Sequence, residues 1–211
     1  QTKTMIRLFS ALCFSLFAAA AGAQGLAPDA LIKSISDDVI SIVKSDKEIK
    51  AGNRAKINAL VDAKVLPHFN FDRMTALAVG RNWPKANAAQ QKVLVTEFRT
   101  LLVHTYSGAL STYKNEVIEF KPLRAAAADT DVTVRTQVKQ PGTEPVSIDY
   151  SMEKTPGGWK VYDVVVGGVS LVTNYRENFN AEIRDGGIDG LIKSLANKNR
   201  SLETQAGTKS K

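Results

Sequence analysis

The sequence predicts an α+β fold in which an antiparallel, four-stranded meander sheet is covered on one face by about five or six helices. Two observations predict this fold class. Apolar residues recur at helical spacing as far as about Lys114, and beyond it apolar and polar residues alternate with a period of two. The alternating strands have one apolar face, which other elements must cover. Helical spacing returns after Gly167-Gly168, so the helices of both parts of the chain can cover this face.

Four helices are expected in the first half of the chain. The first begins at Pro28, the second ends before Pro67, and the third covers about 71–79 and stops at the following glycine. The fourth is the longest, because Asn87 can cap it and Gln90 stands at its third position, a pattern typical of a capping box. Their apolar stripes are Ile32, Ile35, Val39, Ile42 and Val43; Ile57, Leu60, Val61 and Val65; Met74, Leu77 and Ala78; and Leu94, Phe98, Leu101, Leu102, Thr105 and Ala109.

Four strands are expected in the second half. Two proline–glycine segments, Pro141-Gly142 and Pro156-Gly157-Gly158, are short enough to be tight turns, so successive strands should pair antiparallel. Each strand presents apolar side chains on one face and polar side chains on the other. The expected strands cover 116–123, 131–139, 146–154 and 159–166.

The chain is expected to end in helices and a polar tail. A helix from about Leu171 should stop at Gly186-Gly187, and a short helix should follow it through Leu195. From Lys198 onward the residues are polar and aperiodic, which predicts a flexible tail. The expected organisation is therefore a signal peptide at 1–23, one domain at 24–197 and a tail at 198–211.

The N-terminal residues have the pattern of an export signal. A candidate initiator, Met5, is followed by Arg7 as the positive charge and by an apolar stretch at 8–21. Small residues at Ala21-Gly22-Ala23 form a cleavage site, and the apolar stretch is shorter than the ~20 residues of a membrane span. We therefore expect an exported protein, cleaved after Ala23 and left without cysteine.

The charge of the sequence is mildly basic and does not indicate a nucleic-acid partner. Lys and Arg number 28 against 21 for Asp and Glu, which gives +7, and loss of Lys3 and Arg7 with the signal leaves 7 − 2 = +5. The basic residues are scattered among acids rather than gathered in a stripe with aromatics, so no nucleic-acid partner is expected. Mild basicity suits an anionic membrane surface or an ordinary solvated surface equally well.

Catalytic and metal-binding patterns are absent from the sequence. It has no G-x-S-x-G, H-E-x-x-H, P-loop or G-x-G-x-x-G pattern, and neither His68 nor His104 has a second histidine or a cysteine at helical spacing with which to bind a metal. Asp163, inside an otherwise apolar strand, is the one candidate general base. It can equally be a buried acid hydrogen-bonded to nearby backbone or to Arg176. No cofactor and no metal are expected.

Two stretches of the sequence are distinctive when taken together. The first runs from Gly80-Arg81-Asn82-Trp83 through Glu97-Phe98-Arg99 to His104-Thr105-Tyr106. The second runs from Trp159-Lys160-Val161-Tyr162-Asp163 through Gly168-Val169-Ser170 to Asn174-Tyr175-Arg176. Together they resemble the MlaC family, also known as toluene-tolerance or ABC-transporter auxiliary proteins. The resemblance covers about residues 29–198.

The resemblance implies a soluble periplasmic carrier that moves phospholipid between the outer and inner membranes and helps maintain the lipid asymmetry of the outer membrane. It implies an internal apolar cavity between a curved sheet and helices, with the acyl chains inside and the headgroup near solvent. The implied cargo is a diacyl phospholipid. The implied partners are an outer-membrane lipoprotein–porin complex and an inner-membrane ABC transporter with a substrate-binding ring, the carrier itself being a monomer and not an enzyme.

Candidate lipid-binding residues follow from placing the apolar stripes around such a cavity. Candidate headgroup ligands are the cations within or beside the two resembling stretches, Arg81, Lys85 and Arg176. Each of these residues can instead belong to an ordinary core or surface. The candidates for the acyl chains are Met74, Leu77, Val79, Phe98, Leu102, Ile148, Tyr150, Met152, Val164, Val166, Val169, Val172 and Tyr175.

Three other functions remain open at the level of sequence. One is a small-molecule enzyme with a cone-shaped α+β cavity and Asp163 as its base. Another is a carrier of lipoprotein acyl chains, which would use the same physics for a different cargo. The third is an interaction adaptor with a filled core.

Overall fold

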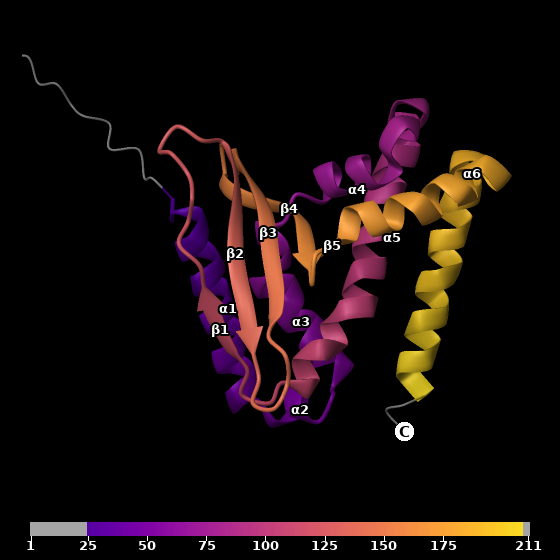
Figure 1. The fold of residues 1–211 in the computed structure, drawn as a ribbon. Coiled ribbons are helices and arrows are strands. Elements are labelled where there is room, and N and C mark those ends of the chain that lie inside the picture. Colours follow the sequence, from indigo (N-terminus) through magenta and orange to yellow (C-terminus); the bar gives the residue numbers. More distant parts are fainter. Residues whose placement is uncertain (1–24, 209–211) are drawn as a thin grey trace, which may run out of the picture.

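The α+β fold class is confirmed. The computed structural model describes residues 25–208, in which a run of helices precedes an antiparallel sheet and a long helix follows it (Figure 1). The expected signal peptide, its cleavage site and the last residues of the expected tail lie outside the described residues. Within residues 25–208, no helix is both long and apolar enough to cross a membrane.

The helices of the first half begin and end close to where their caps predict. The Asn87 side chain accepts from the Gln90 amide at 2.9 Å and Gln90 Oε1 accepts from the Asn87 amide at 2.9 Å, so the capping box is confirmed. Gly80 ends its helix at φ 62°, a backbone conformation that suits glycine. The segments are α1 (Pro28–Ser45), α2 (Lys47–Lys50), α3 (Arg54–Lys64), η1 (Leu66–His68), α4 (Phe71–Val79), η2 (Gly80–Lys85), α5 (Ala88–Tyr106) and η3 (Ser107–Thr112), where η marks a 3₁₀ helix.

The sheet is an antiparallel meander in the order β1-β2-β3-β4-β5. Its apolar face lies against the helices, and at its centre Val134, Tyr150 and Val164 are paired across three neighbouring strands. A register shift at Ser151/Met152 interrupts the pairing of β3 with β4. The strands are β1 (Val117–Phe120), β2 (Asp131–Lys139), β3 (Val146–Thr155), β4 (Gly158–Val166) and β5 (Val169–Ser170).

The predicted strand count of four was wrong, because β5 is a fifth strand. Gly167 and Gly168 have φ of 57° and 85°, which turns the chain back within two residues and pairs Val169 with Val166. Two residues are too few to show an alternating pattern, so the sequence carried no strand signal there. The first strand is also shorter than expected, covering 117–120 rather than 116–123.

The last helix, α6 (Leu171–Thr208), differs from the prediction at its C-terminal end. Gly187 has φ 68° and ψ −170°, so two helical segments meet in a sharp bend where Gly186-Gly187 predicted a stop. Beyond it the helix continues through Thr208, where a flexible tail from 198 was expected. The reason is packing: Leu202 repeats the spacing of Leu195 and packs on the same core, and Asn199 is buried.

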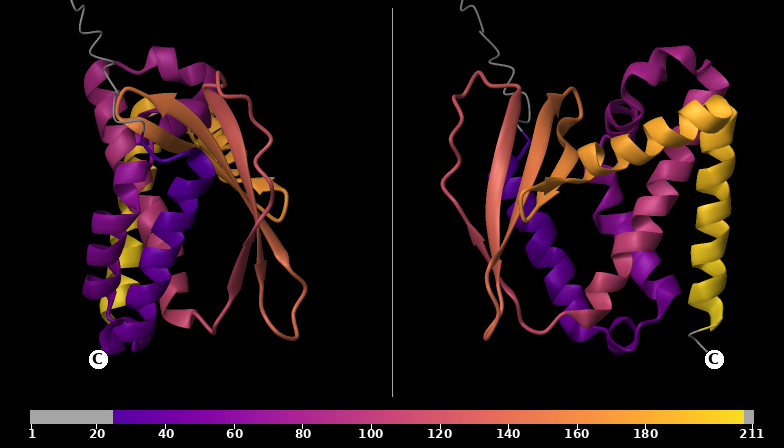
Figure 2. Two further views of the ribbon diagram at one scale, coloured as in Figure 1. Left: turned by 90° about the vertical axis from the view of Figure 1, so that its left-hand side faces the viewer. Right: turned by 45° about the vertical axis from the view of Figure 1, so that its right-hand side comes forward.

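The structure has two parts that the first segment of α6 connects. One part is the sheet with α1 beside it, and the other is α5 with the second segment of α6 running alongside (Figures 1 and 2). The first segment of α6 leaves β5 at the sheet and crosses to α5.

Candidate functional site

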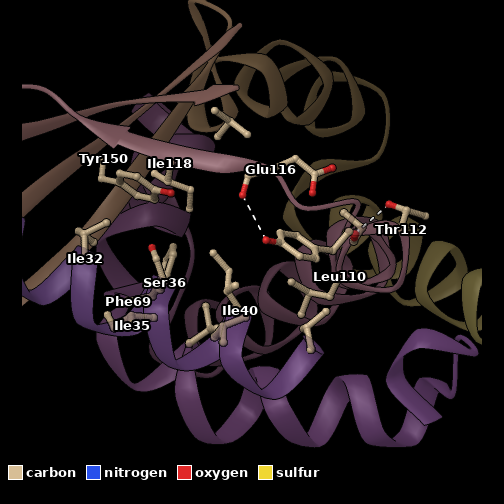
Figure 3. Close-up of a pocket in the computed structure, with 16 residues that line it drawn as sticks. Ile32, Ile35, Ser36, Ile40, Phe69, Leu110, Thr112, Glu116, Ile118 and Tyr150 are labelled. Carbon is tan, nitrogen blue, oxygen red and sulfur yellow. Dashed lines mark hydrogen bonds between the residues drawn. The ribbon is translucent and has the colours of Figure 1, made fainter. Parts of the chain in front are cut away.

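An apolar pocket of about 430 Å³ lies between α1 and the sheet. Its walls come from α1, η3 and strands β1 to β3, so residues distant in sequence meet in it (Figure 3). Ile32 and Ile35 of α1 face Ile118 and Tyr150 of the sheet across this pocket. We call it the α1 pocket.

A second apolar pocket of about 320 Å³ adjoins the first. It lies between α3, α4 and α5 on one side and β3 and β4 on the other, and we call it the α5 pocket. The two pockets share four of their lining residues: Val65, Phe69, Leu110 and Tyr150. The two pockets therefore adjoin at these side chains, and we call them the two lobes of the site.

The chemistry of the lining suits aliphatic chains. Most of the side chains are branched aliphatic or aromatic, with a few hydroxyls and the Glu116 carboxylate at the side of the α1 pocket. Burial in this apolar setting raises the pKa of Tyr150 to about 12, because a phenolate would lose its hydration there. Residues 25–208 contain no cluster of His, Cys, Asp and Glu that could hold a metal ion. Such a site can exclude water from hydrocarbon, and it has few groups that could transfer a proton.

The structure brings together six of the thirteen apolar residues that the sequence nominated. Tyr150 lines both pockets, and five others line the α5 pocket: Met74, Leu102, Ile148, Val164 and Val166.

The other seven lie away from both pockets. Leu77, Val79, Phe98, Val172 and Tyr175 pack in a filled core among α4, α5 and α6. Met152 is buried against other residues beneath the sheet, and Val169 is exposed on β5. These positions follow the same apolar stripes, but packing partners that the sequence does not reveal decide which of them face open space.

The three cations nominated for a headgroup do not line either apolar pocket. Arg176 donates from Nε to the Leu77 carbonyl oxygen at 2.8 Å, which fixes α6 to the end of α4. Lys85 donates to Asn82 Oδ1 at 2.9 Å, and Arg81 is exposed on the same 3₁₀ turn. Their positions suit a structural or surface role.

Two other cations lie closer to the apolar space. Lys160 and Arg99 line a polar pocket of about 410 Å³ that shares Phe69 and Phe71 with the α5 pocket. Lys160 donates to the Pro67 carbonyl oxygen at 2.5 Å, and Arg99 pairs with Asp62 at 3.4 Å. Nothing in the local sequence distinguishes these two cations from others on the surface.

The α1 face of the site was missed at the level of sequence. No residue of α1 was among the candidates for lipid binding, but Ile35, Ile40 and Val43 of this helix line the α1 pocket together with Leu110 of η3 and Ile118 of β1. One signal was present in the sequence, because the apolar face of α1 is wide. This face consists of Ile32, Ile35, Val39, Ile40 and Val43. Residues of irregular segments such as η3 carry no periodic signal.

Asp163 has a structural environment. Its Oδ2 accepts from the Ser170 hydroxyl at 2.5 Å and its Oδ1 accepts from the Val172 amide at 3.1 Å. Ser170 in turn accepts from the Thr173 amide at 3.0 Å, so the pair caps the start of α6. Of the two interpretations of this acid, the geometry favours hydrogen bonding to nearby backbone over a catalytic base.

Comparison with known proteins identifies the family. A model of the MlaC protein family matches residues 33–197. The chain belongs to the MlaC family. The chain is 24% identical over 171 residues to the intermembrane phospholipid transport system binding protein MlaC of Haemophilus influenzae, with 80% of each protein covered. It is 25% identical over 168 residues to the toluene tolerance protein ttg2D of Pseudomonas putida, with 77% of this chain and 75% of that protein covered.

A solved structure with the same fold holds a phospholipid. The phospholipid-binding protein of Ralstonia solanacearum, determined in complex with a phospholipid, superposes with a TM-score of 0.78 at 42% identity. The match covers 83% of this chain and 98% of that one.

Proposed function

We propose that this MlaC-family protein is a periplasmic carrier that shuttles phospholipid between membrane complexes of the outer and inner membranes. The observation that carries the proposal is the pair of adjoining apolar pockets between the sheet and the helices. A relative of the same fold is a phospholipid-binding protein in complex with its lipid, and another is named for intermembrane phospholipid transport.

The energetics of lipid in water explain why such a carrier needs docking partners. A diacyl lipid has roughly 30 methylenes, each costing about 0.8 kcal/mol in water, or about 24 kcal/mol in total. This exceeds the usual ceiling of non-covalent affinity, so spontaneous release into water is negligible. Transfer between two apolar environments costs little by comparison. The carrier therefore needs no catalysis of its own, and the affinities of its partners set the direction.

The proposal includes the partners and the compartment. We place the protein in the periplasm, exported by the signal at 1–23 and acting as a monomer. Its proposed partners are an outer-membrane lipoprotein–porin complex and an inner-membrane ABC transporter with a substrate-binding ring. The net charge of +5 after signal cleavage supports approach to anionic membrane surfaces.

Native mass spectrometry with lipid extraction tests the cargo. The mature protein, purified without detergent, is expected to carry an added mass of phospholipid size and to release diacyl lipid. A bare protein that also takes up no lipid from vesicles would refute the carrier proposal. Recovery of lipoprotein instead of free phospholipid would replace the proposed cargo, and a water-soluble ligand would revive the enzyme alternative.

A matched pair of tryptophan variants tests the position of the cargo. Val166 is 39% exposed and lines the α5 pocket, whereas Val146 is 43% exposed and lines neither pocket. V166W is expected to reduce lipid loading at least about tenfold by filling the pocket, while V146W keeps normal loading. Equal loading of both variants would place the lipid elsewhere. Circular dichroism verifies that both variants fold.

A further inference from the structure

Tyr150 is placed where the two pockets meet. It lies in the middle of β3, paired with Val134 on one side and Val164 on the other. Its side chain lines both the α1 pocket and the α5 pocket, as do Val65, Phe69 and Leu110. Of these four shared residues, Tyr150 alone has a side-chain group that can form hydrogen bonds.

The Tyr150 hydroxyl has no hydrogen-bond partner among residues 25–208, and its partly buried side chain borders the space of both pockets. The contrast with Tyr113 of the same pocket is direct, because that hydroxyl donates to the Glu116 carbonyl oxygen at 3.2 Å (Figure 3). Ser36 of α1 is a second hydroxyl in the α1 pocket that bonds to no described residue, not even to a carbonyl of its own helix. Figure 3 shows the hydroxyls of Ser36 and Tyr150 directed into the space between α1 and the sheet.

The shape of a diacyl lipid brings a polar group to this position. Its two acyl chains diverge from adjacent glycerol carbons, and each begins with an ester. If one chain lies in each lobe, the two esters lie where the lobes meet, beside Tyr150. An ester carbonyl oxygen accepts hydrogen bonds and donates none, so it matches a hydroxyl that lacks a partner.

We infer that the Tyr150 hydroxyl donates a hydrogen bond to an ester carbonyl of the bound diacyl lipid, and that Ser36 donates to the second ester. This inference rests on the proposed function and adds a specificity to it. The site selects lipids with ester-linked chains over lipids of the same length with ether-linked chains, because an ether has no carbonyl oxygen to accept these bonds.

The size of the selection follows from ordinary hydrogen bonds. One neutral bond made in an apolar site corresponds to about a three- to tenfold preference. The wild-type protein is therefore expected to enrich the ester lipid by at least that factor. Y150F should bring the ratio of ester to ether lipid close to one third or less of the wild-type ratio, and S36A should lower it by a smaller factor.

A competition experiment measures this ratio directly. Delipidated full-length mature protein is incubated with vesicles holding equal amounts of a diacyl phosphatidylglycerol and its dialkyl ether analogue with chains of equal length. The protein is re-isolated, and mass spectrometry of the extracted lipid gives the ratio. Only folded protein carries lipid, so the ratio remains valid even if a variant is partly unfolded.

Y113F is the matched control, because it removes a tyrosine hydroxyl from the same pocket that already has a protein partner. It is expected to keep the wild-type ratio. An equal ratio in wild type and Y150F, or no ester preference in wild type, overturns the inference while leaving the carrier proposal intact. Failure to load either lipid refutes the carrier proposal, and the inference with it.

Discussion

Two apolar regions of this protein are built from similar residues, but one is tightly packed and the other contains open pockets. Among α4, α5 and α6 the aromatic rings interlock: Phe98 contacts Tyr175 and Phe179 edge-on, with ring centroids 5.0 and 5.1 Å apart, and Phe98 is fully buried. Between the sheet and α1 to α5, Ile148 and Tyr150 are only partly buried and border open space. One region is a filled core and the other a divided pocket.

The difference shows how the fold keeps a pocket open. Protein interiors normally close around voids larger than a water molecule. Here the filled core holds α5 against α6, the bond from Arg176 holds α6 against α4, and the cap from Asp163 of β4 fixes the start of α6 to the sheet. The sheet and α5 are thus connected through α6, which opposes collapse of the apolar side chains between them.

The largest expected effect comes from breaking the filled core. Phe98→Ala should lower the free energy of unfolding by about 3–5 kcal/mol, since it removes a fully buried ring and leaves a cavity. Ile148→Ala should cost only about 1 kcal/mol in the lipid-free protein, because this half-buried side chain already borders open space. Urea denaturation of both delipidated variants measures the comparison.

The same pair separates stability from lipid binding. Phe98 lines neither pocket, so F98A that remains folded at low temperature should still load lipid, whereas I148A should load less despite its greater stability. Equal costs of unfolding for the two variants would mean that the α5 pocket is ordinary packed core.

A smaller loss of stability is expected at the start of α6, which Asp163 and Ser170 cap. Asp163→Asn should cost about 1–2 kcal/mol, because it replaces one of the two carboxylate oxygens that accept from the Val172 amide and the Ser170 hydroxyl with an amide nitrogen, which cannot accept. Ser170→Ala should cost about 1 kcal/mol through loss of the bond from the Thr173 amide. Thermal unfolding measures both, and lipid loading should be unchanged in S170A. Loss of a turnover activity in D163N at unchanged stability would instead restore the enzyme hypothesis.

Much of the fold could be predicted because its signals are local. The capping box of Asn87 and Gln90, the stop at Gly80 and the alternation along 131–139 each depend on a few neighbouring residues. Two misses had other causes, one a strand too short to show a pattern and the other a contact with a distant residue. β5 exists because a glycine turn brings it against β4, and the helix beyond 198 is held by Asn199, which donates to the Glu97 carbonyl and carboxylate oxygens at 2.9 and 2.7 Å.

The site was less accessible from sequence than the fold. An apolar stripe shows which face of an element is buried and not whether that face meets another side chain or a pocket. Leu102 and Phe98 lie one turn apart on α5, yet Leu102 lines the α5 pocket and Phe98 meets two rings of α6. The α1 pocket also needs η3, an irregular segment whose residues follow no period.

The smallest expected effect is a dependence of the free energy of unfolding on pH through His68 of η1. His68 lies in η1 next to the shared pocket residues Val65 and Phe69, and burial, followed by the positive charge of Lys160, lowers its pKa below the ordinary value of 6.5. The unfolded chain therefore takes up this proton at a higher pH than the folded chain does. Stability from this group is complete above pH 6.5 and decreases as the pH falls from 6.5 toward the lowered pKa.

Proton NMR of the His68 ring measures this effect, and Lys160 provides the control. K160Q should move the His68 pKa only part of the way back toward 6.5, because burial is the larger cause and remains. H68Q should remove the corresponding slope of stability against pH and leave the contributions of Phe98 and Asp163 unchanged. A His68 pKa at or above 6.5 in the folded protein would show that η1 is more open to water than this packing implies.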